Sequence, residues 1–342
     1  MNSARFQTIT EQYAKLRVAV VGDFCLDRYL EIDPAKQEIS IETGLAVHNV
    51  VNVRSQPGAA GTILNNLVAL GIGEIFPVGF AGADGEGFEL RTALEKKAGV
   101  KLNYFLQTTQ RRTFTYCKPL ILEAGKAPVE LNRLDSKNWT PTPALLQGRL
   151  IDSLLDVAAQ VDAIIVMDQV DIPETGVVTG KLLEAIRGLS KSQPDKLILA
   201  DSRRGLRGYP PVCFKMNAAE LAAFSSIQGE RTLEEIKQSA AALAVGQKRD
   251  IFVTLAERGI LGASPHGSVE HVAALPVQGE IDIVGAGDAV TANLTAALSA
   301  RATLRESLEL ANAAASVVIH QLGTTGTATV GQIEHLLLAN GA

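Results

Sequence analysis

Short apolar runs and helix-like segments alternate along most of the chain, and this alternation constrains the fold more than any other feature. Runs such as Val18–Val21 and Ala163–Met167 are rich in β-branched residues and end in turns, which is typical of strands buried on both faces. Segments with helical periodicity, 142–159 and 174–190 among them, separate such runs. Strands that alternate with helices form parallel sheets covered on both sides. We therefore expect an α/β fold of three layers, α/β/α, with a mainly parallel central sheet.

Two stretches interrupt this alternation. Residues 29–55 and 101–135 contain short strand-like runs, such as Thr113–Leu122, with no helix between them. These runs favour a small, mainly antiparallel sheet attached to the main body. The chain contains no low-complexity linker that would divide it. We expect residues 1–342 to form one domain, with a β-sheet lid built from the two stretches.

Composition and charge exclude several classes of protein. The chain is 46% hydrophobic and 20% charged, which is too apolar for general disorder. The 32 lysines and arginines against 37 aspartates and glutamates give a net charge of −5, so nothing global favours nucleic acid or an anionic membrane. No apolar run approaches the ~18 residues of a membrane span. Cys25, Cys117 and Cys213 lack disulfide or zinc spacing, and residues 1–17 lack a signal peptide pattern. We expect a cytoplasmic protein.

One motif is suited to binding phosphate. The sequence D-I-V-G-A-G-D spans residues 282–288 and precedes a helix-like segment, 289–300. Gly285 and Gly287 allow close approach to the backbone, and a helix N-terminus offers unpaired N–H groups and a partial positive charge. Asp288 beside such an anion hole makes sense as a base that takes a proton from an attacking hydroxyl. The alternative is a plain loop in which Asp288 is a helix N-cap.

Other phosphate and metal motifs are missing. The chain has no G-x-x-x-x-G-K-[ST] sequence and no G-x-G-x-x-G after its first strand, which excludes a P-loop enzyme and disfavours an NAD-linked oxidoreductase. His266 and His271 flank Glu270 but are five residues apart, which does not match the zinc motif H-E-x-x-H.

These features occur together in a known family. The chain resembles the PfkB-type carbohydrate kinases of the ribokinase-like superfamily over essentially its whole length. The matching segments are 282–288 (D-T-x-G-A-G-D), 22–27 (first strand and sugar-contacting Asp), 57–71 (sugar loop and helix), 215–220 (K-P-N-x-x-E), 253–259 (V-T-x-G-x-x-G) and 311–314 (adenine-flanking helix). Within the family, residues 22–29, 133–135 and 311–318 resemble the heptose-phosphate kinase half of the bifunctional enzymes of ADP-heptose synthesis, without their nucleotidyl-transferring half.

The resemblance implies a role for each matched residue. Asp288 would be the base, and the backbone amides of Gly285, Ala286 and Gly287 would form the anion hole for the γ-phosphoryl group of ATP. The implied sugar contacts are Asp27, Gly58, Thr62 and Asn66. The implied nucleotide contacts are Asn217, Thr254, Gly259 and Asn312. Mg²⁺ would be held by Asn217 and Glu220 through water, since Mg²⁺ keeps much of its hydration.

Several of these residues also have ordinary structural interpretations. The alternative for Asp27 is a solvated turn residue, and the alternative for Asn312 is a polar position in an alanine-rich helix. Asn217 and Glu220 have the spacing of an N-cap and its capping-box partner, and both roles are compatible.

The sequence departs from the family pattern in two places. In the sugar loop, Ala59 replaces a second glycine and Thr62 replaces an asparagine, whose amide would both donate and accept. Asn65 or Asn66, one helical turn later, are candidate substitutes. Beside Asp282, an Ile-Val pair replaces the usual Thr-containing pair, which leaves a monovalent-cation site there open.

We interpret the chain as an ATP-dependent kinase for a sugar or sugar-phosphate hydroxyl, with a heptose 7-phosphate-like molecule as one candidate. A kinase for another small polyol or nucleoside, and a binding protein without turnover, are the alternatives. Basic residues in the lid and after one strand are candidates for clamping a substrate phosphate, or are merely solubilising: Arg111, Arg112, Lys118, Arg133, Arg203 and Arg204. Family members often pair through the lid, so we expect a homodimer through apolar lid positions: Val47, Val50, Val51 and Val53.

Overall fold

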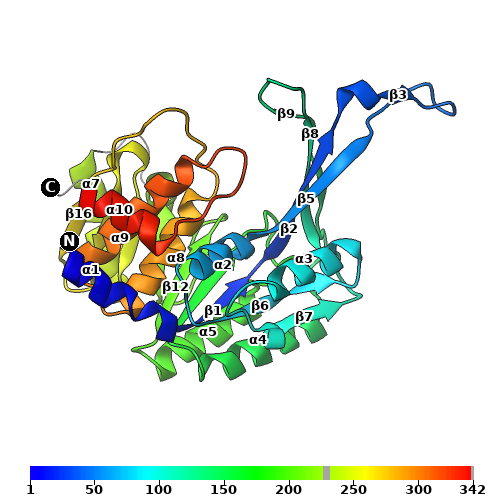
Figure 1. The fold of residues 1–342 in the computed structure, drawn as a ribbon. Coiled ribbons are helices and arrows are strands. Elements are labelled where there is room, and N and C mark those ends of the chain that lie inside the picture. Colours follow the sequence, from blue (N-terminus) through cyan, green and yellow to red (C-terminus); the bar gives the residue numbers. More distant parts are fainter. Residues whose placement is uncertain (226–231, 340–342) are drawn as a thin grey trace.

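The computed structural model of the protein describes residues 1–225 and 232–339, and a large sheet forms the centre of the fold (Figure 1). Among the described residues this sheet has nine strands in the order β16-β15-β14-β13-β12-β11-β1-β6-β7. The bounds are β1 Arg17–Gly22, β6 Glu74–Gly82, β7 Phe105–Thr108, β11 Ala163–Asp168, β12 Leu197–Ser202, β13 Cys213–Asn217, β14 Ile251–Thr254, β15 Ile260–Ala263 and β16 Val269–Val272. The strands from β7 to β14 are parallel, β15 runs antiparallel to β14, and β16 runs antiparallel to β15.

Helices cover both faces of this sheet, which confirms the expected three-layer architecture. One face packs against α4 (Ala144–Ala158), α5 (Gly180–Ser192), α6 (Ala218–Ser225) and α7 (Leu233–Gln247). The other packs against α1 (Ser3–Thr10), α2 (Ala60–Ala69), α3 (Gly85–Glu95), α8 (Ala286–Ser299), α9 (Leu304–Ile319) and α10 (Val330–Ala339).

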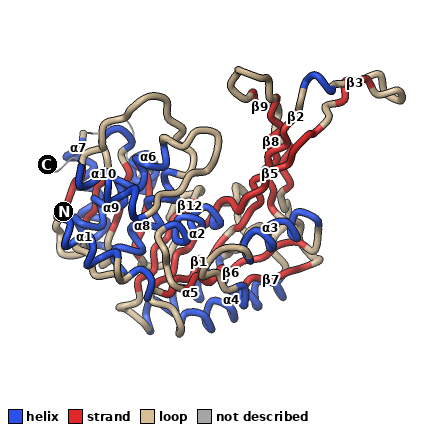
Figure 2. Tube along the Cα trace, viewed as in Figure 1, coloured by secondary structure: helices blue, strands red, loops and turns tan. Residues whose placement is uncertain are grey.

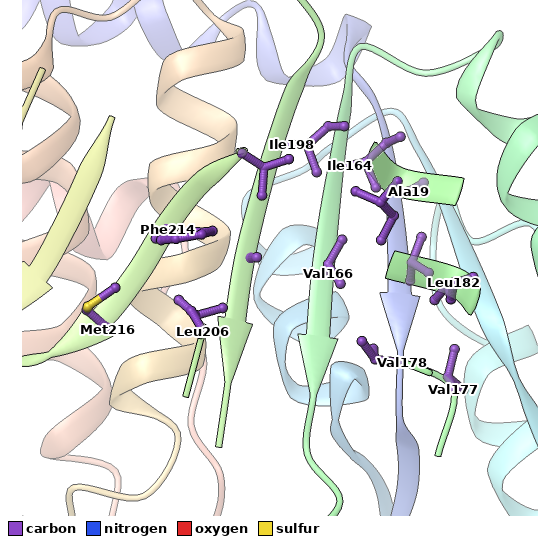
Figure 3. Packing of buried hydrophobic residues seen from close by; sticks show 14 of the residues in the cluster. Ala19, Ile164, Val166, Val177, Val178, Leu182, Ile198, Leu206, Phe214 and Met216 are labelled. Atoms are coloured by element: carbon purple, nitrogen blue, oxygen red, sulfur yellow. The ribbon is translucent and has the colours of Figure 1, made fainter. Parts of the chain in front are cut away.

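Alternate residues of the central strands supply the two apolar faces. Ala19 of β1 and Ile164 and Val166 of β11 pack with Leu182 of α5 and its neighbours on one side (Figure 3). Val20 of β1 belongs to the cluster on the opposite side. Burial on both faces explains why these strands read as continuous apolar runs.

A second sheet projects from the body as a lid (Figure 1). Its strands are β2 (Phe24–Ile32), β5 (Val50–Ala59), β8 (Phe114–Ile121), β9 (Val129–Glu130) and β10 (Leu134–Ser136). They follow the order β10-β8-β2-β5, and β9 pairs with β8. A small hairpin, β3 (Glu38–Ile39) with β4 (Ala46–Val47), lies beyond it. Figure 2 shows the long strands β2 and β5 running from the lid into the body.

The lid differs from the sequence expectation in two respects. The strand β7, within the range 101–135, pairs in parallel with β6 at the edge of the large sheet. Phe105 explains this, because it is buried and packs edge-to-face on Phe24 at 5.3 Å between ring centroids. The strands β2 and β5 extend beyond the range 29–55, from Phe24 and to Ala59 respectively. The expectation of a mainly antiparallel lid sheet is confirmed, since only the pairing of β2 with β8 is parallel.

No described helix is both long and apolar enough to cross a membrane.

Candidate active site

The motif that ends in Asp288 forms the start of α8, on the face of the body that α2 also covers (Figure 1). Gly285 is the N-cap of α8 and adopts φ +84°, a left-handed conformation that favours glycine. A Cβ at Gly285 would lie 2.6 Å from Cγ2 of Thr325 and 3.6 Å from Cγ2 of Thr62. Glycine is therefore required at position 285 both by the backbone and by its neighbours.

The first turn of α8 has the donors of an anion hole. Gly285 has no side chain to cap the helix, so the N–H groups of Gly287 and Asp288 remain without an intrahelical or side-chain partner at this end. The N–H of Ala286 differs, because it donates to the carbonyl of Ile283 at 3.2 Å. Asp288 lies inside the helix, so the alternative in which it is the N-cap is wrong.

Asp288 is partly buried and strongly perturbed. Burial, and then the nearby Asp201 carboxylate, raise its pKa to about 7, and Lys215 opposes the shift. Asp27 also interacts with Asp288 and adds to the rise. A carboxyl group with a pKa near neutrality is suited to taking a proton at physiological pH.

Three side chains form a buried polar cluster near Asp288. The Lys215 ammonium on β13 donates to Oδ2 of Asp201 on β12 at 2.8 Å. The hydroxyl of Thr291, on the second turn of α8, donates to the same oxygen at 3.1 Å. A Cβ at Gly287 would lie 2.9 Å from Nζ of Lys215, so the ammonium lies against the first turn of α8.

Asp27 lies on β2, where the lid joins the body, and is buried. Burial raises its pKa, while Lys118, Arg133 and the hydroxyl of Thr325 oppose the rise. A Cβ at Gly58, on the paired strand β5, would come within 2.5 Å of the Asp27 carboxylate. Asp27 is therefore a strand residue, and its interpretation as a solvated turn residue is wrong.

The remaining sugar-loop residues differ in their burial and contacts. Thr62 is buried with its methyl group toward Gly285. Asn66 is fully buried, and its amide donates to the carbonyl of Thr62 at 3.0 Å and to that of Gly326 at 3.5 Å. In this conformation Asn66 links α2 to the segment after α9 and is not accessible to a ligand. Ala59 adopts φ 53° and ψ −117°, which is unusual for any residue with a Cβ.

The predicted nucleotide residues gather around one cavity of about 590 Å³. Asn217, Thr254, Gly259 and Asn312 all line it, together with Gly287 of the anion hole. Most of the other lining residues are apolar, which is suitable for a flat base. The Asn312 amide donates to the carbonyl of Ala273 at 2.8 Å, so its carboxamide is held in one orientation.

Asn217 and Glu220 form a reciprocal cap at the start of α6. The Asn217 N–H donates to Oε2 of Glu220 at 2.7 Å, and the Glu220 N–H donates to Oδ1 of Asn217 at 2.9 Å. The structural interpretation is thus correct. The pair also fits Mg²⁺, because both side chains carry oxygen atoms of the kind that Mg²⁺ takes, and Asn217 lines the cavity where phosphate and water would fill the other positions. Within the described residues, no three His, Cys, Asp or Glu side chains cluster as a metal site.

Asp282 stabilises the turn before α8. Its Oδ1 accepts the N–H of Val284 at 3.0 Å, and its own N–H donates to the carbonyl of Ile319 at 2.8 Å. These bonds give Asp282 a structural role, and its part in a monovalent-cation site stays a prediction.

Most of the basic residues near the sugar end are already paired. Arg133 binds Asp135, Arg203 binds Asp171, and Arg204 binds the buried Asp168. Lys118 differs, since it makes no ion pair with any described carboxylate and lies 5.0 Å from the ring centre of Tyr29. Arg111 donates to Thr140 and to the carbonyl of Pro141, which is a structural role.

Two residues at the site were not singled out from the sequence. Thr325 lies near Asp27, whose pKa it lowers, and packs on Gly285, yet it lies in a segment with no motif. Thr291 lies on α8 three residues after Asp288 and reads as an ordinary helix position. Asp201, which binds Thr291, did have a signal in the sequence, because a carboxylate at the end of a strand marks a position where ligands bind.

A family model described as pfkB family carbohydrate kinase matches residues 15–329. Among curated proteins, the chain is similar to the bifunctional protein HldE of Hyphomonas neptunium, with 31% identity over 97% of this chain and 65% of that protein. It is similar to HldE of Bradyrhizobium sp., with 27% identity over 93% of this chain and 63% of that protein. The chain thus spans about two thirds or less of the length of these relatives.

Solved structures share the fold. Phosphofructokinase-2 from Escherichia coli in complex with substrates and products gives a TM-score of 0.72 at 17% identity, covering 96% of this chain and 100% of that one. Arabidopsis thaliana ribokinase complexed with ribose and ATP gives a TM-score of 0.65 at 18% identity, covering 94% and 98%. At this identity the likeness supports the ribokinase-like fold alone.

Proposed function

The chain belongs to the PfkB family of carbohydrate kinases, and on that premise we propose that it transfers the γ-phosphoryl group of ATP to a hydroxyl of a sugar phosphate. A heptose 7-phosphate-like molecule is our preferred substrate, because two curated relatives are HldE proteins. One observation carries the proposal. Asp288, whose pKa is raised, lies in the first turn of α8, and this uncapped helix N-terminus borders the nucleotide cavity.

Asp288 acts as the base. A sugar hydroxyl between Asp27 and Asp288 loses its proton to the Asp288 carboxylate as its oxygen attacks the γ-phosphorus and the bond to ADP breaks. The N–H groups of Gly287 and Asp288 stabilise the charge on the transferring group. Losing one such donor typically costs ~10²–10³ in rate. Mg²⁺, held near Asn217 and Glu220, would supply charge neutralisation on the phosphates.

Basic residues of the lid support the proposal that the substrate sugar already carries a phosphate group. Lys118 and Arg133 act on Asp27 electrostatically from strand β8 and from the segment before β10. Lys118 has no carboxylate partner among the described residues, so its charge is available to a substrate anion. Closure of the lid over this end would exclude water and limit hydrolysis of ATP.

One observation favours a second candidate. Thr62 replaces the usual asparagine, and Asn66 is buried and engaged with backbone carbonyls, so the side-chain readout of the sugar is reduced. This supports a kinase for another small polyol or nucleoside, or a protein that binds without turnover.

A substrate panel tests these alternatives. ADP formation is measured with Mg²⁺-ATP and either free sugars, sugar phosphates, polyols or nucleosides, for the wild type and for Asp288→Asn. We expect sugar phosphates to be preferred, a loss of at least ~10²-fold in Asp288→Asn, and Lys118→Met to weaken only phosphorylated substrates. No turnover with any member, or a fully active Asp288→Asn, would contradict the proposal.

A further inference from the structure

The mechanism above leaves a buried ion pair unused. Lys215 and Asp201 come from adjacent parallel strands, and both are almost completely buried. Buried ion pairs are expensive to desolvate and are weak evidence for stability alone. This pair is adjacent to the proposed base, which suggests a chemical reason for it.

Three carboxylates act on Lys215 electrostatically, those of Asp201, Asp288 and Glu220. The Lys215 ammonium donates to Asp201 at 2.8 Å, and it also interacts electrostatically with Asp288. Gly287 makes this location possible, because any side chain there would press on Nζ. The ammonium therefore lies beside the helix turn whose N–H groups form the anion hole.

We propose that Asp201 is a positioning residue that, given the proposed function, holds the Lys215 ammonium beside the Gly287 backbone and out of an ion pair with Asp288. Asp288 then stays free to accept the proton of the substrate hydroxyl. The ammonium stays directed at the position of the transferring phosphoryl group, where positive charge stabilises the transition state.

Asp201 is itself fixed. It lies on the central strand β12, and the hydroxyl of Thr291, which also reaches the carbonyl of Gly287 at 3.1 Å, lies 3.1 Å from the same carboxylate oxygen. Thr291 is fully buried, so this tie is protected from water. An acceptor held by a strand and a helix can compete for the ammonium without following it toward Asp288.

The charged groups around Asp288 determine in which direction each substitution should shift its ionisation. Asp201 on β12 and Asp27 on β2 disfavour its ionised form, and Lys215 on β13 favours it. The thiol of Cys25 on β2 also faces Asp288. Without Asp201, Lys215 turns to Asp288, and the Asp288 carboxyl group becomes easier to ionise. Without Lys215, the carboxylate becomes harder to ionise.

Steady-state kinetics over pH 5–9 tests whether the loss of Asp201 and the loss of Lys215 shift the ionisation of Asp288 in opposite directions. In Asp201→Asn we expect kcat to fall by about 10- to 100-fold with little change in KM. We also expect the acidic limb of the kcat profile to move to lower pH by roughly one unit. In Lys215→Met we expect the limb to move to higher pH. Movement of both limbs in the same direction would overturn the proposal.

Two further variants separate positioning from general stability. Thr291→Val keeps every charge and removes the hydroxyl that reaches both Asp201 and the carbonyl of Gly287, so its limb should move in the same direction as in Asp201→Asn, by less. Asp168→Asn removes another buried carboxylate that pairs with an arginine, Arg204, and should lower stability without moving the limb. A limb in Asp168→Asn that moves as far as in Asp201→Asn would contradict the proposal.

A titration without substrate keeps this inference distinct from the proposed function. In protein labelled with ¹³C at aspartate carboxyl groups, the Asp288 signal is the one lost in Asp288→Asn. Its midpoint should be lower in Asp201→Asn than in the wild type. An unchanged or higher midpoint would overturn the role of Asp201, even for an active kinase. A lower midpoint in a protein without kinase activity would leave the geometry correct and the proposed function wrong.

Discussion

At the scale of single residues, Asp288 reflects a conflict between function and stability. Burial and a neighbouring carboxylate raise its pKa from 3.8 to about 7. The folded protein thus holds the proton of Asp288 more tightly than the unfolded chain does. Between these two values, ionisation favours the unfolded state, so the residue lowers stability as pH rises.

This conflict predicts the effect of Asp288→Asn on stability. The neutral amide removes the penalty, so the variant should be more stable than the wild type by on the order of 2 kcal/mol at pH 8, after discounting for partial exposure. Its advantage should grow between pH 4 and 7 and be absent below pH 4. Urea unfolding at several pH values measures it, and Asp282→Asn is the control. An advantage that is independent of pH would contradict the assigned pKa.

The site could be predicted from the sequence where backbone geometry determines residue type. Gly285, Gly58 and Gly259 lie in segments that resemble family motifs, and in the structure each occupies a position where a side chain would collide with its surroundings. Thr325 could not be identified, since its two contacts are with residues distant in sequence. The contacts of the Asn66 amide with the carbonyls of Thr62 and Gly326 could not be predicted, because helical spacing does not reveal which group an amide faces.

At the scale of elements, the junction of β5 and α2 is where the sugar loop departs from its family. The strand ends at Ala59 and the helix begins at Ala60, so the chain turns sharply at one residue. The positive φ of Ala59 costs about 1–2 kcal/mol in a residue with a Cβ. The family glycine at this position would avoid that strain.

The strain predicts that Ala59→Gly stabilises the protein. The relief of strain exceeds the extra chain entropy of glycine, and the expected net gain is about 0.5–1 kcal/mol. Ala60→Gly, one residue later and inside the helix, should instead destabilise by about 1 kcal/mol. Urea unfolding of both variants measures the difference. A loss of stability in Ala59→Gly would contradict the interpretation.

The sequence allowed the main elements to be predicted because the periodic patterns are long. The central strands are buried on both faces, and helices such as α4 and α5 have clear apolar stripes. The lid boundaries could not be placed, because a strand shared between body and lid has no break in pattern where it leaves the core. The strand β7 was assigned to the lid since four residues contain no signal of their sheet partner.

At the scale of the whole molecule, the lid leaves apolar surface uncovered. Val50, Val51 and Val53 of β5 are between 43% and 46% exposed, and β5 is an edge strand of the lid sheet. Exposed apolar residues on an edge strand favour pairing with another sheet. We infer that two copies of the chain associate through this edge.

Association through the lid predicts the behaviour of charged variants. Light scattering at micromolar concentration should give a dimer for the wild type and a monomer for Val51→Lys with Val53→Lys. The control is Leu155→Lys, an exposed apolar residue on α4, which should remain dimeric. A monomeric wild type, or a dimer that survives both lysines, would reject the lid as the interface.

The central claim is that the chain transfers the γ-phosphoryl group of ATP to a sugar phosphate, with Asp288 as the base. The most direct measurement follows labelled γ-phosphate in a single turnover, with enzyme in excess over ATP and a heptose 7-phosphate or another sugar phosphate present. We predict that the label appears on the sugar in the wild type, with little inorganic phosphate, and remains on ATP in Asp288→Asn. Label released only as inorganic phosphate, or transferred equally fast by Asp288→Asn, would contradict the account.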